Sequence, residues 1–462
     1  MSLGMSDQLV IFGISGDLAY KMTIPSLYRL EKRGLLGVPV LGVAGTDWGP
    51  DGLAQRARAS ITENAGEPLD EAVFSRLMAK MSYIYGDFSD PELYEKVFEA
   101  LGGAQAPTFY LEIPPSLFGM VAKGLAQAGL LAEPSRLVVE KPFGHDRASA
   151  DALAAELHQY VQEDQLYRID HFLGKEPVQD ILHLRFANSL LEPVWNRDHV
   201  RGIMITMAES FGVADRGGFY DPVGALRDVV QNHILQMLAL TCLEPPTGAP
   251  MASRRLDFFR GVETVKVTDV VRGQYAGYQD VKGVKPGSTT ETFVALRLKV
   301  ESWRWSGVPV FIRTGKEMPM TATEIVVRLK NPPGVVYPSR QRPPGHDDIV
   351  LRIGKNSGVG FSLRIKKPGT DFDEPEMVNL DFAQSLGYIP TPYERLLTDA
   401  MKGDHSLFPD QAVEDETWRI VEPILTDPPK IETYEPGTWG PRSAIDMARS
   451  IGGWREPDAQ TD

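Results

Sequence analysis

Residues 168–176, with the sequence RIDHFLGKE, bring an aspartate, a histidine and a lysine close together in the chain. Pro177 follows, and apolar residues then recur at helical spacing up to residue 186. Because proline is favoured in the first turn of a helix, we expect His171 and Lys175 just before a helix N-terminus. Such an end presents free N–H groups and a partial positive charge, which suits a phosphate. The alternative is a charged loop with a solvated lysine.

A second polar group lies in the helix predicted for residues 224–240 and comprises Arg227, Asp228, Gln231, Asn232 and His233. At about 100° per residue, His233 falls on the apolar face of this helix with Val230 and Met237. An inward-facing histidine is either a core residue with satisfied hydrogen bonds or a partly buried general base, since imidazole titrates near neutrality. A base would need a carboxylate to fix its tautomer, and Asp170 is the candidate.

A glycine turn near the start of the chain forms a third candidate site. Residues 9–12 are an apolar run, followed by GISGDLA at 13–19 and then by a helical pattern. A strand, a glycine turn and a helix in this order are the context of a dinucleotide-binding fold. The spacing is G-x-x-G-x-x-A, however, and any tight turn between a strand and a helix favours glycine. The residues expected to hold the coenzyme are Gly13, Ser15, Gly16, Asp17 and Leu18.

These candidates would be positioned by alternating strands and helices over the first third of the chain. The predicted strands are residues 9–12, 38–44, 82–85, 108–113, 136–140 and 167–169, and helical patterns cover 69–80, 92–100 and 117–128. Such alternation predicts a parallel, doubly wound sheet. Ligands then bind beyond the carboxyl ends of the strands.

Several candidate residues fall at that edge of the predicted sheet. Thr46 follows the second strand, where the adenosine ribose of a dinucleotide would lie. Lys141 follows the fifth strand and would face the coenzyme, although it could be an ordinary strand-end lysine. Pro142 could form a cis peptide bond, but most such bonds are trans. The sixth strand delivers Asp170 and His171 to the same edge.

The rest of the chain predicts a second domain dominated by strands. The predicted strands are residues 200–211, 263–273, 293–301, 308–313, 324–328, 349–353, 358–365 and 376–382; the helices are 178–190, 224–240, 391–402 and 410–425. Successive strands with few helices between them indicate a large, mostly antiparallel sheet. We therefore expect a Rossmann-like coenzyme-binding domain at 5–170 and a β+α domain for substrate binding and oligomerisation at 171–462. Proline-rich loops are expected at 332–333 and 341–345.

Composition excludes several classes of protein. Apolar residues make up 42% of the 462 residues and charged residues 24%, which is typical of a globular protein with a large core. The net charge of -14 argues against nucleic-acid binding. A single cysteine, Cys242, allows neither an intrachain disulfide nor a cysteine metal cluster. We see no membrane-spanning apolar run and no signal peptide, so we expect a cytoplasmic protein, and we interpret residues 1–4 as an expression remnant.

Taken in order, the motifs of the chain resemble one family, the glucose-6-phosphate dehydrogenases. They are GISGDLA at 13–19, YLEIPPSLF at 110–118, EKPFG at 140–144, RIDHFLGKE at 168–176, RGGFYD at 216–221, RDVVQNH at 227–233, GQY at 273–275, RTGK at 313–316 and YERL at 393–396. The motif at 168–176 is the most specific. The resemblance extends from about residue 8 to residue 455.

The resemblance implies oxidation of glucose 6-phosphate at C1 to 6-phosphoglucono-δ-lactone, with hydride transfer to NADP or NAD. By position, His233 resembles the general base and Asp170 the carboxylate that orients it. The residues that resemble substrate ligands are His171 and Lys175 for the phosphate, Glu209 and Asp228 for sugar hydroxyls, Lys316 for the sugar, and Lys141, which is shared with the coenzyme. The resemblance implies no metal, and it implies a homodimer or homotetramer.

The sequence departs from the family at three substrate positions. The family usually has tyrosine at the position of Phe172, with its hydroxyl on the phosphate, and loss of that donor costs about 1–3 kcal/mol if a phosphate oxygen is left unpaired. A second cation is usual five residues after the position of Lys316, where this chain has Thr321. A common glutamine is replaced by Gly354. These changes leave open a dehydrogenase of a related sugar phosphate.

The coenzyme loop also departs from the family. NADP-preferring members carry arginine near the position of Gly45 or Thr46 and further basic residues near Met22. Lys21 remains here, but Asp47 adds negative charge beside the ribose, where a carboxylate favours a free 2′-hydroxyl. We therefore predict that NAD is used well and that it can be preferred over NADP.

A non-catalytic paralogue that only binds coenzyme is the alternative from a different class of protein. The chain retains Asp170, His233, Lys175 and Lys141 together. A purely structural role would require none of these four side chains, so their joint presence favours an enzyme.

Overall fold

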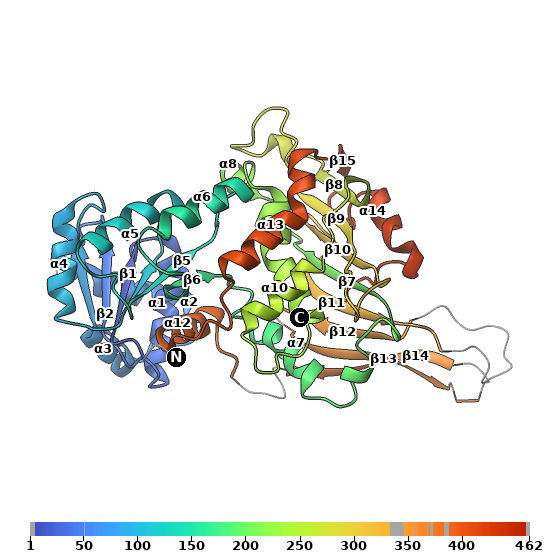
Figure 1. The fold of residues 1–462 in the computed structure, drawn as a ribbon, viewed down its shortest axis with the longest axis horizontal. Helices are drawn as coiled ribbons and strands as arrows, with labels where there is room; N and C mark the ends of the chain where they lie inside the picture. The colour runs from blue at the N-terminus through green and yellow to red at the C-terminus, as the bar shows by residue number, and fades with distance from the viewer. Residues whose placement is uncertain are drawn as a thin grey trace. The chain divides into compact units, whose positions relative to one another are not determined.

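The computed structural model describes residues 5–49, 51–332, 346–354, 356–366, 368–369, 373–382 and 388–458 (Figure 1). The expected remnant at 1–4 and the loop at 341–345 lie outside these residues, as does Pro333. The chain divides into two compact units. The first contains the described residues of Met1–Lys175, Pro250–Ala252 and Pro390–Asp415; the second contains those of Glu176–Ala249, Ser253–Ile389 and Glu416–Asp462. The domain limits 5–170 and 171–462 stay a prediction.

A six-stranded sheet forms the centre of the first unit. Its strands are β1 (Gln8–Phe12), β2 (Val40–Ala44), β3 (Met81–Tyr85), β4 (Pro107–Leu111), β5 (Arg136–Glu140) and β6 (Leu166–Ile169). Their spatial order is β3-β2-β1-β4-β5-β6, and every neighbouring pair is parallel. All residues of β1, β2, β4 and β5 are buried, because helices cover both faces of a doubly wound sheet. The predicted Rossmann-like architecture is confirmed.

The helices of this unit form two packed groups. They are η1 (a π-helix, Ala19–Thr23), α1 (Ile24–Lys32), α2 (Gly52–Asn64), α3 (Glu71–Lys80), α4 (Pro91–Leu101), α5 (Phe118–Gln127), α6 (Arg147–Leu157) and α12 (Pro392–Lys402). Helix α1 packs against α2, α3 and α12, whereas α5 packs against α4 and α6. Asp70, Asp90 and Asp146 cap α3, α4 and α6 by accepting backbone N–H bonds. Helix α12 thus joins this unit from late in the chain.

The second unit is built around a nine-stranded sheet. Its strands are β7 (Val200–Ala208), β8 (Val270–Tyr275), β9 (Phe293–Leu298), β10 (Val310–Gly315), β11 (Ala322–Leu329), β12 (Asp348–Arg352), β13 (Gly358–Lys366), β14 (Asp373–Asp381) and β15 (Ile431–Tyr434). The order is β14-β13-β12-β11-β7-β10-β9-β8-β15. The pairs β7–β10 and β8–β15 are parallel, and the other pairs are antiparallel. The predicted large, mostly antiparallel sheet is confirmed.

The remaining longer helices are α7 (Glu176–Phe186), η6 (Leu226–Ile234), α9 (Leu235–Cys242), α10 (Met251–Arg260) and α13 (Gln411–Thr426). Two expectations for this region need correction. Residues 263–269 do not continue the strand predicted for 263–273, because Val267–Asp269 form a 3₁₀ turn and β8 begins only at Val270. The helix predicted at 224–240 is a π-helix, η6, that continues as α9. No helix that the structure describes is both long and apolar enough to cross a membrane.

Candidate active site

The turn after β1 requires glycine. Gly13 has φ +87°, and a Cβ on it would lie 2.2 Å from the carbonyl oxygen of Glu112. Residues that carry a side chain rarely adopt that backbone conformation, so only glycine fits here without strain. The Gly13 N–H donates to the carbonyl of Val43 at 2.7 Å, and the Gly16 N–H donates to the carbonyl of Gly13 at 2.8 Å. These bonds fold the turn tightly between β1 and η1.

The other residues predicted for this turn lie at its open side. Ser15 and Leu18 are partly exposed, and Asp17 is exposed. The carboxylate of Asp17 lies 3.7 Å from the ammonium of Lys21, and both are well exposed to solvent. An ion pair of this kind contributes little to stability. In a turn of this kind, a phosphate is attracted mainly by the free N–H groups at the start of the helix.

The loop after β2 lies against this turn. Thr46 donates its hydroxyl to the Ser15 hydroxyl at 3.3 Å, and Tyr83 donates to the Thr46 carbonyl. Asp47 is exposed, and its Oδ1 accepts the N–H of Gly49 at 3.0 Å. Thr46 therefore stands beside the glycine turn, while the carboxylate of Asp47 closes a local turn at the surface.

One residue at this place was missed in the sequence. Arg56 of α2 donates from Nη2 to the Ser15 carbonyl at 3.2 Å. The resemblance to the family directs attention only to basic residues at Gly45 or Thr46, directly after β2, and near Met22. Because α2 was not among the predicted helices, no sequence pattern directed Arg56 toward the turn.

The stretch at 168–176 forms a compact turn after β6. The Asp170 carboxylate accepts the N–H of Phe172 at 2.9 Å, and its carbonyl accepts the N–H of Leu173 at 3.0 Å. Asp170 is only 4% exposed. Helix α7 begins at Glu176, directly after Lys175, as expected for the end of this loop. The motif therefore presents its polar side chains just before a helix N-terminus.

Lys175 is the most perturbed cation of this loop. Its ammonium lies 3.3 Å from the ring centre of Phe172, and the ring of His171 meets the same phenyl edge-on at 5.0 Å. Burial lowers the pKa of Lys175 to about 8, and the charge of Asp170 partly opposes this shift. A half-desolvated ammonium of this kind gains more from a nearby anion than a solvated lysine would.

Lys141 directly follows β5, beyond the carboxyl end of the strand. The Lys141–Pro142 peptide bond is cis, whereas the sequence favoured trans. The preceding residue, Glu140, accepts a hydrogen bond from the hydroxyl of Tyr110 at 2.6 Å. Burial raises the pKa of Glu140 to about 7, and Lys141 is among the groups that oppose the shift. The lysine therefore lies next to a buried carboxyl group.

A second buried acid extends this cluster and was also missed in the sequence. Burial raises the pKa of Glu112 to about 8, and a hydrogen bond from Thr23 opposes the shift. Tyr393 of α12 hydrogen-bonds to Glu140, so α12 closes the cluster from late in the chain. The available signal was the position of the two glutamates at the carboxyl ends of neighbouring strands β4 and β5.

In the second unit, η6 carries two of the predicted residues. His233 is 2% exposed, and Asp228 is partly exposed. The buried side of the helix also holds Leu226 and Val230, as the apolar pattern predicted. The helix has π geometry, which in proteins often marks a functional site. It packs against β10.

Glu209 and Lys316 form an ion pair in the second unit. Each directly follows one of the parallel neighbours β7 and β10, and the Glu209 N–H donates to the Gly315 carbonyl at 3.0 Å. The ammonium of Lys316 also lies 5.1 Å from the ring centre of Tyr220. The two residues are thus brought together by the register of the strands, which no local sequence pattern reveals.

The two departures in this unit have different surroundings. The Thr321 hydroxyl accepts a hydrogen bond from the Ser210 N–H at 3.0 Å. It also forms a hydrogen bond with the Ser210 hydroxyl at 2.9 Å. Its hydroxyl therefore ties the segment before β11 to the segment after β7. Gly354 lies after β12 and is exposed.

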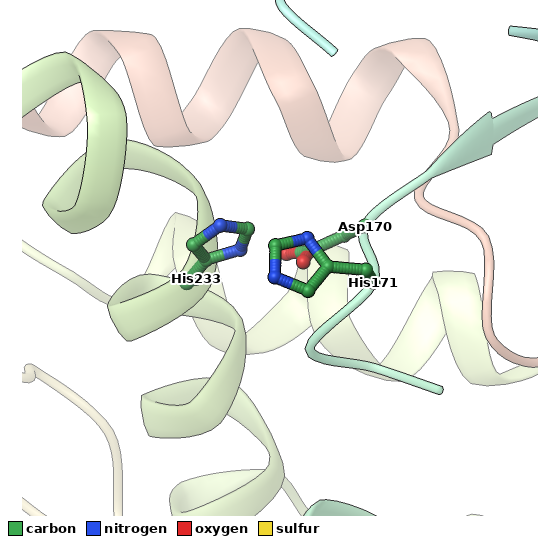
Figure 2. Close-up of side chains that lie close together, drawn as sticks. All are labelled: Asp170, His171 and His233. Atoms are coloured by element: carbon green, nitrogen blue, oxygen red, sulfur yellow. The ribbon is translucent and has the colours of Figure 1, made fainter. Parts of the chain in front are cut away.

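The predicted site residues thus fall into two sets. The first unit holds Gly13, Ser15, Gly16, Asp17, Leu18, Thr46, Lys141, Asp170, His171 and Lys175, and the second holds Glu209, Asp228, His233 and Lys316. In the first unit they follow β1, β2, β5 and β6 at one edge of the parallel sheet. Figure 2 shows Asp170 and His171 on the segment that leaves β6, and His233 on η6.

Comparison with protein-family models gives two matches that together span almost the whole chain. The model described as "Glucose-6-phosphate dehydrogenase, NAD binding domain" matches residues 10–180. The model described as "Glucose-6-phosphate dehydrogenase, C-terminal domain" matches residues 182–455.

Similar proteins and structures agree with these matches. Glucose-6-phosphate 1-dehydrogenase 1 of Mycobacterium tuberculosis is 47% identical over 98% of this chain and 97% of its own length. A crystal structure of glucose-6-phosphate 1-dehydrogenase from Mycobacterium avium is 46% identical, with a TM-score of 0.91 over 99% of this chain and 100% of that one. A glucose-6-phosphate dehydrogenase solved in complex with its substrate, glucose 6-phosphate, is 29% identical, with a TM-score of 0.89 over the same shares of the two chains.

Proposed function

The chain belongs to the glucose-6-phosphate dehydrogenase family, and we propose that His233 and Asp170 perform the proton transfer of its reaction. The reaction oxidises glucose 6-phosphate at C1 to 6-phosphoglucono-δ-lactone, with hydride transfer to NADP or NAD. It belongs to carbohydrate metabolism, as the first oxidation of the pentose phosphate pathway. The observation that carries the proposal is the burial of His233, at 2% exposure, on the inner side of a π-helix.

His233 acts as the general base in this proposal. The C1 hydroxyl proton passes to the imidazole, the C1–H electron pair leaves as hydride, and the C1–O bond becomes a carbonyl. To Asp170 we assign the role of the carboxylate that fixes the tautomer of the imidazole and stabilises the imidazolium as it forms. A side chain as deeply buried as Asp170 is held rigidly, which suits a positioning role.

The substrate is held by the remaining predicted residues. His171 and Lys175, together with the N-terminus of α7, bind the phosphate, and the phosphate raises the pKa of Lys175 back toward its ordinary value. Glu209 and Asp228 accept hydrogen bonds from sugar hydroxyls. Lys316, already paired with Glu209, contacts the sugar.

The first unit has the features that a dinucleotide needs. The strand order reverses between β1 and β4, which is where such sheets bind dinucleotides. Gly13 allows the close backbone turn that a pyrophosphate requires, since any side chain there would meet Glu112. The coenzyme, which supplies the nicotinamide that accepts the hydride, is bound and oriented by Gly13, Ser15, Gly16, Asp17, Leu18, Thr46 and Lys141.

Substitution of the base tests the proposal. In His233→Asn we expect kcat with glucose 6-phosphate to fall by roughly 10²- to 10⁴-fold, with little change in the affinity for coenzyme. Initial rates are followed by absorbance at 340 nm with NAD and NADP in parallel. Asp170→Asn should also lower kcat, because the imidazole would lose the carboxylate that orients it.

The exposed His183 of α7 provides a matched control, His183→Asn, which should retain the wild-type rate. If His233→Asn kept more than a tenth of the activity, the base would have to be another group. Comparison of glucose 6-phosphate with other hexose and amino-sugar phosphates shows whether Phe172 and Thr321 have changed the preferred sugar.

The protein is also proposed to form homodimers or homotetramers. Leu363 and Ile365 of β13 and Val378 and Leu380 of β14 are each about half exposed. The register pairs Val359 with Leu380, so these four side chains share one face of the sheet. Exposed apolar side chains gathered on one face are typical of a subunit interface.

Light scattering with size exclusion measures this association. The double variant Leu363→Lys/Val378→Lys should shift the protein toward the monomer, whereas Leu190→Lys, at a separate exposed leucine, should not. An unchanged mass in the double variant would mean that this face is not the interface. We further propose a cytoplasmic location, since the reaction draws on free nicotinamide coenzyme and sugar phosphate.

A further inference from the structure

The junction between the glycine turn and the loop after β2 contains a guanidinium group. Arg56 Nη2 donates to the Ser15 carbonyl at 3.2 Å, and the guanidinium lies 4.0 Å from the ring centre of Tyr20. Thr46 is joined to Ser15 through its hydroxyl. Two contacts in different directions therefore fix the guanidinium beside Ser15, the residue to which Thr46 is bonded.

The charge of Arg56 is not matched by a nearby acid. Arg58, on the same helix, is paired with Glu71 at both oxygens, but no carboxylate within the described parts of the chain forms an ion pair with Arg56. Glu63 hydrogen-bonds with the hydroxyl of Tyr20, the ring partner of Arg56. The Arg56 Nε is buried without a hydrogen-bond partner among the described residues. A guanidinium held in this way is pre-organised for an anion that brings its own oxygens.

The fold determines which anion reaches this place. In a sheet of this order, the pyrophosphate lies at the glycine turn and the adenosine ribose at the end of the second strand. Strand β2 ends at Ala44, and Thr46 lies beside Ser15, the residue that Arg56 contacts. A phosphate on the ribose 2′-oxygen would therefore lie next to this guanidinium.

One opposing charge faces the same ribose. Asp47 is exposed, and its Oδ1 accepts the Gly49 N–H, which stabilises the loop but leaves the carboxylate charged. Lys21 is the other cation near the turn, and it is paired with Asp17 at 3.7 Å. The 2′-phosphate would thus meet Arg56 and Asp47 as opposed charges.

We propose that Arg56 recognises the 2′-phosphate of NADP and so sets the preference between the two coenzymes. The inference adds a residue that determines coenzyme preference to the function proposed above. It rests on that function only because it requires a nicotinamide dinucleotide as the coenzyme. It accounts for NADP binding in a chain that has no arginine directly after β2. It also limits the NAD preference expected from Asp47 alone, because the arginine offsets that carboxylate.

Coenzyme fragments test the proposal without any turnover. Adenosine 2′,5′-bisphosphate and 5′-AMP differ in the 2′-phosphate alone, and their dissociation constants are measured by isothermal titration calorimetry. In Arg56→Gln the affinity for the bisphosphate should fall by roughly 10- to 100-fold more than that for AMP, as for loss of a charge-assisted hydrogen bond. Arg58→Gln is the matched control and should leave both affinities unchanged.

Two further variants test whether the shape of the guanidinium and the charge of Asp47 affect binding of the 2′-phosphate. Arg56→Lys keeps the charge without the planar fork and should fall between wild type and Arg56→Gln. Asp47→Asn should strengthen bisphosphate binding, because it removes the opposing charge. In kinetics, Arg56→Gln should raise KM for NADP at least about tenfold more than KM for NAD, with kcat less affected.

Equal losses for both fragments in Arg56→Gln would overturn the proposal, because Arg56 would then act only by holding the Ser15 turn. Wild type that binds the two fragments equally would overturn it as well. If the wild-type protein bound neither fragment, that result would contradict the coenzyme site itself and therefore the function proposed above. Thermal unfolding of each variant verifies that the fold is retained.

Discussion

Phe172 stands in the motif at 168–176, at the position where the resemblance to the family implies a tyrosine. Its ring is buried, lies under the ammonium of Lys175 and touches His171 edge-on. The ring therefore packs the two proposed phosphate ligands but offers no hydrogen bond of its own. Burial lowers the pKa of Lys175 to about 8.

Phe172→Tyr should restore the hydroxyl donor that the family usually has at this position. We expect KM for glucose 6-phosphate to fall by roughly 5- to 100-fold, the equivalent of about 1–3 kcal/mol for one hydrogen bond to a charged oxygen. The change in kcat should be smaller, since the phosphate is remote from C1. Initial rates with varied glucose 6-phosphate measure both constants.

Phe98→Tyr, on the exposed side of α4, is the matched control and should leave KM unchanged. An unchanged or higher KM in Phe172→Tyr would mean that the phosphate does not reach this ring. The family's hydroxyl would then have been replaced by a different arrangement, with Lys175 as the main ligand.

At the scale of residues, the sequence predicted which side chains belong to the candidate site better than it predicted which residues surround them. The apolar face of η6 correctly placed His233 in the interior. Arg56 was missed because its partner, Ser15, belongs to a different element, and the contact depends on how α2 packs. Glu112 and Glu140 were missed for the same reason, since only the parallel pairing of β4 and β5 brings their strand ends together.

At the scale of elements, the turn after β1 has the strictest requirement. Gly13→Ala would introduce a Cβ 2.2 Å from a backbone carbonyl oxygen at φ +87°. We expect a loss of stability of about 1–3 kcal/mol and a marked loss of affinity for both coenzymes, because the turn must move to relieve the clash. Thermal unfolding and fragment binding measure the two effects.

Gly16→Ala is the comparison within the same turn. Its Cβ would lie 3.1 Å from the Gly13 carbonyl, and its φ lies outside the left-handed region, so the stability loss should be smaller. If the two variants were equally stable, the conformation of Gly13 would not be what fixes this turn.

Helix type was the least predictable property of the elements. The spacing of Val230, His233 and Met237 correctly indicated a helix. In a π-helix each backbone hydrogen bond spans one residue more than in an α-helix, and so short an apolar pattern cannot distinguish the two helix types. The same holds for η1, where the π geometry directly follows the glycine turn. Helices α2 and α6 escaped prediction because few large apolar side chains mark their buried faces: only Leu53 and Ile61 in α2 and Leu157 in α6.

At the scale of the whole molecule, both sheets could be predicted from the sequence. Strands and helices alternate in the first part of the chain, and strands dominate the rest. Strand β15 was not predicted, because it is short and mostly exposed apart from Tyr434. The membership of α12 in the first unit could not be predicted either, since it joins residues about 250 positions apart, such as Tyr393 and Glu140. Long-range pairing of this kind is decided by packing and leaves no local pattern.

The buried acids of the first unit predict how the stability of the protein depends on pH. Burial raises the pKa of Glu112 from 4.5 to about 8 in the folded protein. The folded state therefore holds the proton more tightly than the unfolded chain does. The resulting stabilisation is present in full below the unfolded pKa and is lost as the pH rises through the folded pKa.

Glu112→Gln replaces this titrating group by a neutral one of the same shape. Wild type should lose stability relative to the variant as the pH rises from about 5 to about 9, and the difference in melting temperature should level off beyond that. Glu71→Gln removes an exposed carboxylate whose pKa its partner Arg58 lowers, so its difference from wild type should not follow this course. Differential scanning calorimetry over that pH range measures the differences. If the difference between wild type and Glu112→Gln did not vary with pH, Glu112 would be ionised in the folded protein, and hydrogen bonds donated by Thr23 and Tyr110 would have to stabilise the carboxylate.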